Sequence, residues 1–228
     1  MKYKAVLFDL DGTLVNTLRD LADSVNHVLG QFSLPTHSVE SYKWRVGNGA
    51  RMMISRSLPE DQQELLGEVL PRQQAYYGEH YCDTSRPYPG VPEAVAELKR
   101  RGLKMAVLSN KPDGHTQGIV RRLFGADVFD LVMGKREDMP LKPDPASALW
   151  VAEQLGVRPA EVIYVGDTRV DMETASRAGM LAVGVTWGYR DRQELLENGA
   201  RILVDRAEQL IECLGYESAE APGSGGQG

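Results

Sequence analysis

The chain has 228 residues, of which 42% are hydrophobic, so its length allows one large domain or two, with a sizeable core. Its formal net charge of −6 argues against a general nucleic-acid binder, because neutralising a phosphate backbone requires clustered lysine and arginine. Since no apolar run approaches the length of a membrane span and acids interrupt the first apolar stretch, we expect no membrane segment, no signal peptide and a cytoplasmic location.

The first predicted strand covers residues 4–10, whose nearly continuous apolar run is typical of a strand that is covered on both faces. From Thr17 to about Tyr81 the apolar residues recur at helical spacing, and the pattern contains no convincing strand. The helices that we expect in this stretch cover residues 17–32, 38–46, 51–58 and a Gln- and Glu-rich segment from 59 onward.

Strands and helices alternate in the rest of the chain. A helix is expected between Pro92, which suits the first helical position, and Gly102, which can close the helix in a left-handed turn. Such alternation predicts an α/β fold in which a parallel sheet carries helices on both faces. The further strands are predicted at residues 103–110, 129–134, 161–167, 181–188 and 201–205, and the further helices at 116–125, 145–156 and 172–180.

The helical stretch after the first strand is therefore an insertion into the α/β domain, and we interpret it as a separate α-helical cap. The expected organisation is a catalytic core formed by residues 1–14 and 85–217, with the cap over residues 15–84. Residues 218–228 lack apolar side chains to bury, so we expect a disordered tail there.

Polar residues follow the predicted strands at the carboxyl edge of the sheet, where open α/β sheets bind their ligands. Each of them alone has an ordinary explanation, since Asp is common in turns before Gly, an acid suits the first turn of a helix, and a lone lysine is usually solvated. Their coincidence at one edge indicates a functional site. The residues are Asp9, Asp11, Gly12, Thr13, Ser109, Asn110, Lys142, Asp144, Asp167 and Asp171.

The acids among these residues predict a metal site. Asp9, Asp11 and Asp167 would repel one another, at a cost of about 4 kcal/mol for each contact at about 4 Å, unless a cation lies between them. Oxygen ligands without His or Cys select a hard ion, Mg²⁺ before Ca²⁺, and the spacing does not fit a calcium loop. Cys82 and Cys213 lack C-x-x-C spacing and are expected to be reduced, unpaired thiols.

A metal at such an edge is suited to hold a phosphoryl group, with Lys142 as a second positive charge and Thr13, Ser109 and Asn110 as further phosphate-binding residues. A carboxylate can attack phosphorus, and we assign this role to Asp9 at the end of the strand. Asp11 can then protonate the leaving oxygen and later deprotonate water. The expected partner is a small phosphorylated metabolite.

At this point the motifs resemble those of a known family. The stretch "DLDGT" at Asp9–Thr13, then Ser109, Lys142 and "GDTRVD", which contains Asp167 and Asp171, resemble the four motifs of the haloacid-dehalogenase superfamily in order and spacing. The resemblance implies a Rossmann-like core with a helical cap inserted after the first motif. It also implies Mg²⁺ held by Asp9, Asp167 and the backbone carbonyl of Asp11, with Asp171 beside these ligands. The second acid of the first motif points to phosphoryl transfer and away from carbon–halogen cleavage.

The segments "SNKP", "LKPDP" and "VGNGAR" are similar to those of phosphoglycolate phosphatases within this superfamily. This similarity implies hydrolysis of 2-phosphoglycolate to glycolate and phosphate through an aspartyl-phosphate on Asp9. Pyrophosphate, sugar phosphates and nucleotides stay open as substrates, as do a phosphomutase and a non-catalytic binding protein as alternatives. Asn48 and either Arg51 or Arg45 could contact the substrate from the cap, or they could be surface residues. A homodimer also stays open.

Overall fold

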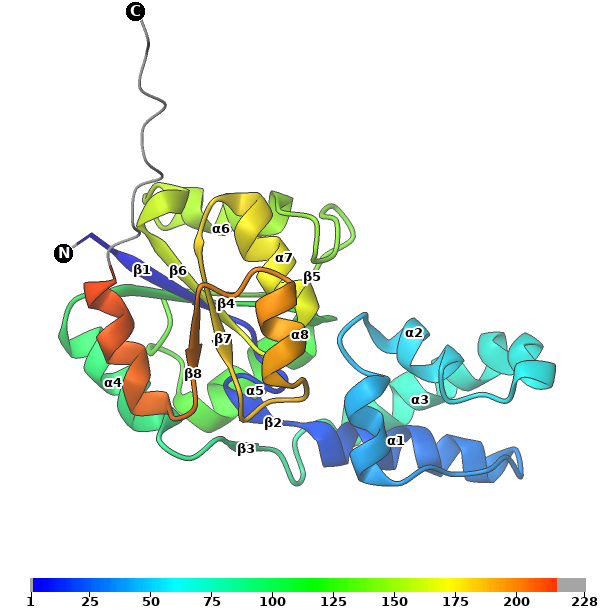
Figure 1. The fold of residues 1–228 in the computed structure, drawn as a ribbon. Coiled ribbons are helices and arrows are strands. Elements are labelled where there is room, and N and C mark those ends of the chain that lie inside the picture. Colours follow the sequence, from blue (N-terminus) through cyan, green and yellow to red (C-terminus); the bar gives the residue numbers. More distant parts are fainter. Residues whose placement is uncertain (1, 217–228) are drawn as a thin grey trace, which may run out of the picture.

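The computed structural model describes residues 2–216, and its largest feature is a six-stranded parallel sheet (Figure 1). The strand order β5-β4-β1-β6-β7-β8 places β1 inside the sheet, paired in parallel with β4 on one side and β6 on the other. The chain order reverses direction at β1, and ligands of open α/β sheets bind at such a point. The strands are β1 (Ala5–Phe8), β4 (Lys104–Pro112), β5 (Leu131–Lys135), β6 (Val162–Gly166), β7 (Leu181–Val185) and β8 (Ile202–Val204).

Helices cover both faces of the sheet, because successive side chains of a strand point to opposite faces. Val6 and Phe8 pack with α4 (Val91–Arg100), α5 (Asp113–Phe124) and the 3₁₀ helix η4 (Ala207–Gly215). Leu7, between them in β1, packs on the other face with the helices there. Those helices are α6 (Ala146–Gln154), α7 (Arg169–Ala178) and α8 (Arg192–Glu197), and a short 3₁₀ helix, η3 (Pro159–Glu161), precedes β6. The predicted α/β fold with a parallel sheet is therefore confirmed.

The inserted helices form a second lobe beside the core, as Figure 1 shows in blue and cyan. This cap has an apolar cluster of its own, which draws on α1, α2, α3 and the segments between them. Its elements are α1 (Leu18–Gln31), η1 (Val39–Trp44), α2 (Ala50–Ser55), η2 (Glu60–Leu65) and α3 (Leu66–His80). The predicted α-helical cap is confirmed, although two of its segments are 3₁₀ helices where we expected α-helix.

Two connections between core and cap run side by side as an antiparallel pair, β2 (Val15–Asn16) and β3 (Arg86–Pro87). Next to them the buried carboxylate of Asp20 accepts hydrogen bonds from the backbone and hydroxyl groups of Thr84 and Ser85, at 2.5 to 3.2 Å. Asp20 thereby ties the start of α1 to the chain that returns to the core. We propose that the cap begins and ends at this pair of strands, close to the predicted limits of 15 and 84.

The short η3 was not predicted, and neither were the two helical elements of the core that follow β7, namely α8 and η4. Both are short, and their buried residues are few: Leu195 in α8, and four residues in η4 at positions 207, 210, 213 and 214. The periodic signal of such a segment is weak, although Asp191 does cap α8 by accepting a hydrogen bond from the backbone of Glu194 at 2.9 Å.

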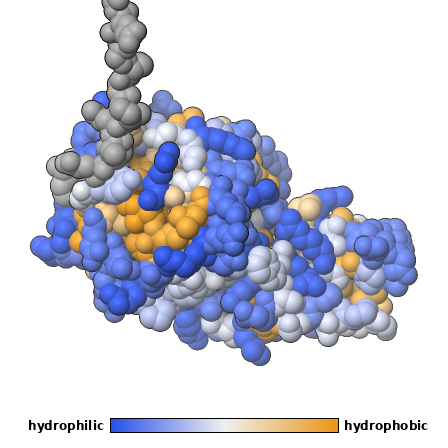
Figure 2. All heavy atoms as spheres, viewed as in Figure 1, coloured by the Kyte–Doolittle hydropathy of each residue, from blue (hydrophilic) through white to orange (hydrophobic). Residues whose placement is uncertain are grey.

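Other expectations concern single features of the chain. Cys82 and Cys213 are buried and form no disulfide, as predicted. Among residues 2–216 no helix has the length and apolar character required to cross a bilayer. The predicted disordered tail, 218–228, lies outside the described residues. Figure 2 shows an apolar area on the core around the edge strand β8, where Ile202 and Leu203 are half-buried, and a mostly hydrophilic cap surface.

Candidate active site

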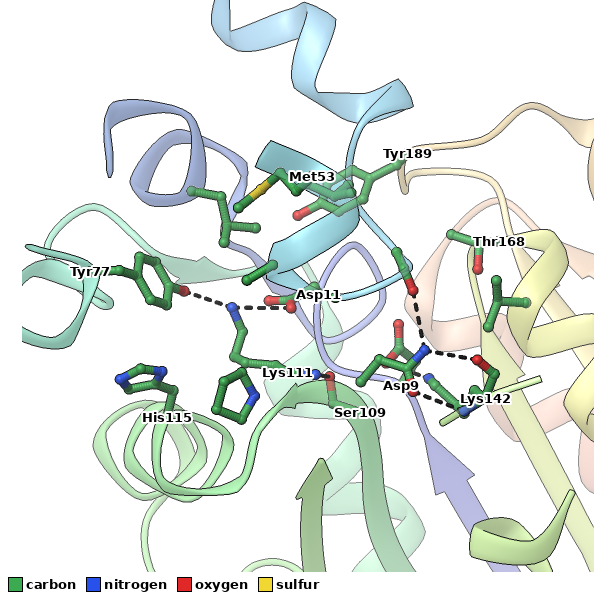
Figure 3. Close-up of a pocket in the computed structure, with 18 of the residues that line it drawn as sticks. Asp9, Asp11, Met53, Tyr77, Ser109, Lys111, His115, Lys142, Thr168 and Tyr189 are labelled. Carbon is green, nitrogen blue, oxygen red and sulfur yellow. Dashed lines mark hydrogen bonds and ion pairs between the residues drawn. The ribbon is translucent and has the colours of Figure 1, made fainter. Parts of the chain in front are cut away.

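The ends of β1 and β4 and the loop before α6 meet under the cap and line one cavity, with the cap helices α2 and α3 on its other side (Figure 3). The predicted site residues that line this cavity are Asp9, Asp11, Ser109, Asn110, Lys142 and Asp171. Thr13 and Asp167 lie behind this wall, both buried. Residues from distant parts of the chain are therefore brought together where the topology of the sheet predicts a site.

Three buried carboxylates form a cluster at this edge. Asp9, Asp167 and Asp171 each offer an oxygen, and these oxygens lie within 4.8 Å of one another. The sequence had grouped Asp9 and Asp167 with Asp11; in the structure Asp11 lies outside the cluster, and Asp171 is part of it. An all-oxygen set of this kind suits Mg²⁺, so the residues present fit the predicted ion.

Lys142 lies against this cluster. Its buried ammonium group donates to Asp9 Oδ1 and Asp171 Oδ1, each at 2.8 Å, and to the carbonyl oxygen of Leu108 at 3.0 Å. Burial opposes the charged form, but Asp171 and Asp9 outweigh it and hold the pKa of Lys142 well above its ordinary value. Lys142 is therefore a permanent positive charge beside Asp9.

Asn110 makes hydrogen bonds within the protein, and its predicted contact with phosphate stays a prediction. Its side-chain oxygen accepts from the backbone N–H of Lys142 at 2.9 Å, and its amide donates to the carbonyl oxygen of Lys142 at 3.0 Å. The same amide donates to the carbonyl oxygen of Gly47 in the cap at 3.3 Å. In this structure Asn110 therefore holds the lysine loop in place, while the Ser109 hydroxyl accepts from the backbone of Lys111 at 3.2 Å.

Asp167 is enclosed on every side. Thr13, predicted to bind phosphate, donates its hydroxyl to Asp167 Oδ1 at 3.0 Å, and the backbone N–H of Tyr189 donates to Oδ2 at 2.8 Å. A Cβ atom at Gly12 would lie 2.2 Å from Oδ2, and one at Gly188 would lie 2.3 Å from the Cβ of Asp167. Two glycines and two hydrogen bonds therefore fix this carboxylate within the cluster.

The acids of the cluster favour a cation between them. Burial and the nearby Asp171 raise the pKa of Asp9 to about 7, although Lys142 opposes this shift. Burial, followed by Asp171 and Asp9, raises the pKa of Asp167 well above its ordinary value. One positive lysine is thus not enough to keep both Asp9 and Asp167 ionised near neutral pH, and a divalent cation would supply the missing charge.

The stability of the metal-free protein should depend on pH through Asp9. A carboxyl group with a raised pKa binds more protons in the folded than in the unfolded state, so its contribution to stability falls as the pH rises from 3.8 to about 7. We expect Asp9→Asn, in chelator, to gain stability relative to the wild type over this range, by up to about 4 kcal/mol. Urea unfolding at several pH values measures the difference. Asp61→Asn, at an exposed site, is the control; a pH-independent difference for Asp9→Asn would show that Asp9 is not desolvated.

Asp11 is held by two side chains for which no role was predicted. The Thr17 hydroxyl donates to Asp11 Oδ1 at 2.5 Å, and Lys111 Nζ lies 3.1 Å from Oδ2. Lys111 is buried and also donates to the hydroxyl of Tyr77 in α3 at 2.6 Å (Figure 3). Burial opposes its charge, but Asp11 and Tyr77 raise the pKa of Lys111 above its usual value. The segment "SNKP" contains Lys111, but its contact with Tyr77 comes from the cap and cannot be read from that segment.

The polar cap side chains that the sequence singled out for substrate contact do not line this cavity in the structure. Arg51 is exposed, Asn48 accepts a hydrogen bond from Arg56 at 2.9 Å, and Arg45 donates to carbonyl oxygens within the cap. The cap residues that do line the cavity are Leu21, Val46, Gly47, Gly49, Ala50, Met53, Gln73, Gln74 and Tyr77. The substrate contact of Asn48 and Arg51 stays a prediction.

Comparison with known proteins identifies the same family as the sequence motifs. A family model described as haloacid dehalogenase-like hydrolase matches residues 6–185. The phosphoglycolate phosphatase of Haemophilus influenzae (strain 86-028NP) is 36% identical over 222 residues, covering 93% of this chain and 99% of that protein. The phosphoglycolate phosphatase of Mannheimia succiniciproducens is 38% identical over 197 residues, covering 82% and 88%.

Solved structures agree. A predicted phosphoglycolate phosphatase from Haemophilus somnus superposes with a TM-score of 0.83 at 31% identity, over 93% of this chain and 98% of that one. The family match covers the inserted helices as well as the strand ends that carry the carboxylates. The chain therefore belongs to the haloacid dehalogenase-like hydrolases.

Proposed function

We propose that this protein is a Mg²⁺-dependent phosphatase that hydrolyses a small phosphate monoester, with 2-phosphoglycolate as its preferred substrate. The observation that carries the proposal is the placement of Asp9, whose carboxylate touches Lys142 and belongs to a three-carboxylate cluster at the wall of a cap-covered cavity. A phosphatase of this kind needs a nucleophile, a positive surrounding and an enclosed space in the same place.

The proposed reaction has two steps. The Asp9 carboxylate attacks phosphorus, the ester P–O bond breaks, and Asp11 gives a proton to the leaving oxygen. Water then attacks the phosphorus of the aspartyl-phosphate while Asp11 takes its proton, so phosphate leaves and Asp9 is regenerated. Asp11 lines the same cavity as Asp9, which supports its assignment as the proton carrier.

Mg²⁺ would be held by Asp9, Asp167 and, as the family resemblance implies, the backbone carbonyl of Asp11. It would supply charge that allows an anionic substrate to approach an anionic nucleophile. Lys142, in contact with Asp9 and Asp171, supplies the second positive charge. Asp171 accepts from the backbone and hydroxyl of Thr168 and from Lys142, and so orients the lysine.

Lys111 supports a substrate with a carboxylate close to the phosphate. It is a buried cation in the wall of the cavity, and its described partners, Asp11 and Tyr77, use two of its three N–H groups. A small anionic group in the cavity can take the third. The curated relatives named above are phosphoglycolate phosphatases, and 2-phosphoglycolate carries such a carboxylate.

Phosphate release from a panel of substrates tests the proposed function. We expect the highest kcat/KM for 2-phosphoglycolate among 2-phosphoglycolate, pyrophosphate, several sugar phosphates and nucleotides. An isomeric sugar phosphate formed without phosphate release would instead identify a phosphomutase. Release of phosphate from none of these compounds in the presence of Mg²⁺ would contradict a phosphatase and favour a binding protein.

Replacing Lys111 with Met tests the carboxylate contact. We expect kcat/KM for 2-phosphoglycolate to fall by about 10- to 100-fold more than kcat/KM for ethyl phosphate, which lacks the carboxylate, because a charged hydrogen bond is lost only with the former. Lys104→Met, in the first position of β4 away from the cavity, is the matched control. Equal losses for both substrates would mean that Lys111 serves Asp11 alone.

A further inference from the structure

The segment that joins β7 to α8 contacts the core and the cap at once. Its residues 187–190 read Trp-Gly-Tyr-Arg, and no catalytic or binding role was predicted for them. The Trp187 indole donates to the carbonyl oxygen of Thr13 at 3.0 Å, next to the hydroxyl that holds Asp167. Gly188 leaves no room for a side chain beside Asp167. This half of the segment is therefore fixed against the carboxylate cluster.

Tyr189 belongs to both lobes. Its backbone N–H donates to Asp167, but its ring is buried in the apolar cluster of the cap. Its hydroxyl lies 3.2 Å from the Thr17 hydroxyl, which in turn donates to Asp11. One residue thus contacts a proposed metal ligand through its backbone and, through Thr17, the proposed proton carrier. Figure 3 shows the Tyr189 ring above the cavity, near Met53 of α2.

Arg190 continues the connection into the cap. Its side chain is only 10% exposed, and its guanidinium donates to the carbonyl oxygens of Lys43 and Val46, the latter at 3.4 Å. It also lies over the Trp44 ring, 5.0 Å from the centroid, and 3.3 Å from a Glu194 carboxylate oxygen. These carbonyls lie at the C-terminal end of η1, where backbone acceptors lack helical partners and attract a cation.

We propose that Tyr189 and Arg190 are positioning residues that tie the docking of the cap to the placement of Asp11 and Asp167. The two residues are adjacent, so a movement of the cap that pulls on Arg190 also moves the backbone N–H that Asp167 accepts. The same movement shifts the ring that reaches Thr17. The catalytic carboxylates are then correctly placed only when the cap is docked. This inference rests on the proposed function for the roles of Asp11 and Asp167.

Amide hydrogen exchange of the metal-free protein tests the link without any use of activity. We expect Arg190→Ala to accelerate exchange by about tenfold or more at residues 43–47 and at the Tyr189 amide, since a hydrogen-bonded charge is lost at one end of the segment. Arg190→Lys keeps the charge but not the fork that reaches two carbonyls, and should give an intermediate result. Arg192→Ala, which removes an exposed ion pair with Asp205, is the matched control and should leave these amides unchanged.

Kinetics separate positioning from a structural role. We expect Arg190→Ala to raise KM by about tenfold, because the cap docks less often, and Tyr189→Phe to lower kcat by about tenfold with KM changed less than about twofold. In the double variant, the fold-loss of kcat/KM should be smaller than the product of the two single fold-losses. Two results would overturn the inference. One is an equal exchange rate of the Tyr189 amide in Arg190→Ala and Arg192→Ala. The other is a loss of kcat/KM in the double variant that equals the product of the single losses. A wild type that releases no phosphate from the panel would instead overturn the proposed function, and the exchange result would still decide the link.

Discussion

Replacing Asp9 with Asn is expected to lower kcat for phosphate release by about 10⁴-fold or more, the scale seen when a covalent nucleophile is removed. The amide of Asn cannot attack phosphorus to form the acyl phosphate. Phosphate release at saturating substrate and Mg²⁺ measures the loss. Acid quenching of the wild type during turnover should trap phosphate on Asp9, and the variant should trap none.

The fold should survive this substitution, which separates chemistry from stability. Asn has the same shape as Asp and keeps an oxygen that can accept from Lys142, while a buried charge is removed. We therefore expect the melting temperature to remain within a few degrees of the wild type or to rise. Asp138→Asn, on the surface, should keep full activity. Turnover of Asp9→Asn near the wild-type rate would refute the assignment of Asp9 as nucleophile.

Replacing Lys142 with Met should harm both activity and stability. The change removes the ion pairs to Asp9 and Asp171 and leaves buried carboxylates without their cation. Breaking a buried pair in this way costs about 3–5 kcal/mol, and we expect that loss of unfolding free energy in chelator. We also expect kcat/KM to fall by about 10³-fold, because a charge that stabilises the transferred phosphoryl group is lost.

Magnesium should return part of the lost stability of Lys142→Met, since it binds only the folded cluster. Urea unfolding with chelator and with Mg²⁺, for the wild type and the variant, measures this. Lys135→Met, at the exposed end of β5, is the matched control and should change neither quantity. Wild-type activity and stability in Lys142→Met would show that the cluster needs no lysine.

The sequence was sufficient to predict the sheet and the edge at which the site lies. The strand before Asp9 is a continuous apolar run, and parallel strands bring their carboxyl ends to one edge, so Asp9, Asp167 and Lys142 could be grouped without coordinates. The direction of each side chain could not be predicted. The Thr13 hydroxyl turns toward Asp167, 154 positions away, and a local pattern carries no record of that partner.

The cap shows the same limit. Arg51 was singled out because it lies near the two glycines and suits a carboxylate, but Ala50 and Met53, three positions apart on α2, face the cavity. Arg51 lies off that face and is exposed. Lys111 was given no role, although it lies within the segment "SNKP". Its burial depends on Tyr77, which comes from a helix of the cap.

A crystal structure grown with Mg²⁺ tests the central claim most directly. The account predicts one ion within about 2.1 Å of a carboxylate oxygen of Asp9 and of Asp167, with Lys142 still beside Asp9. Density that shows no ion between these two carboxylates at saturating Mg²⁺, in crystals of a protein that releases phosphate, would contradict it.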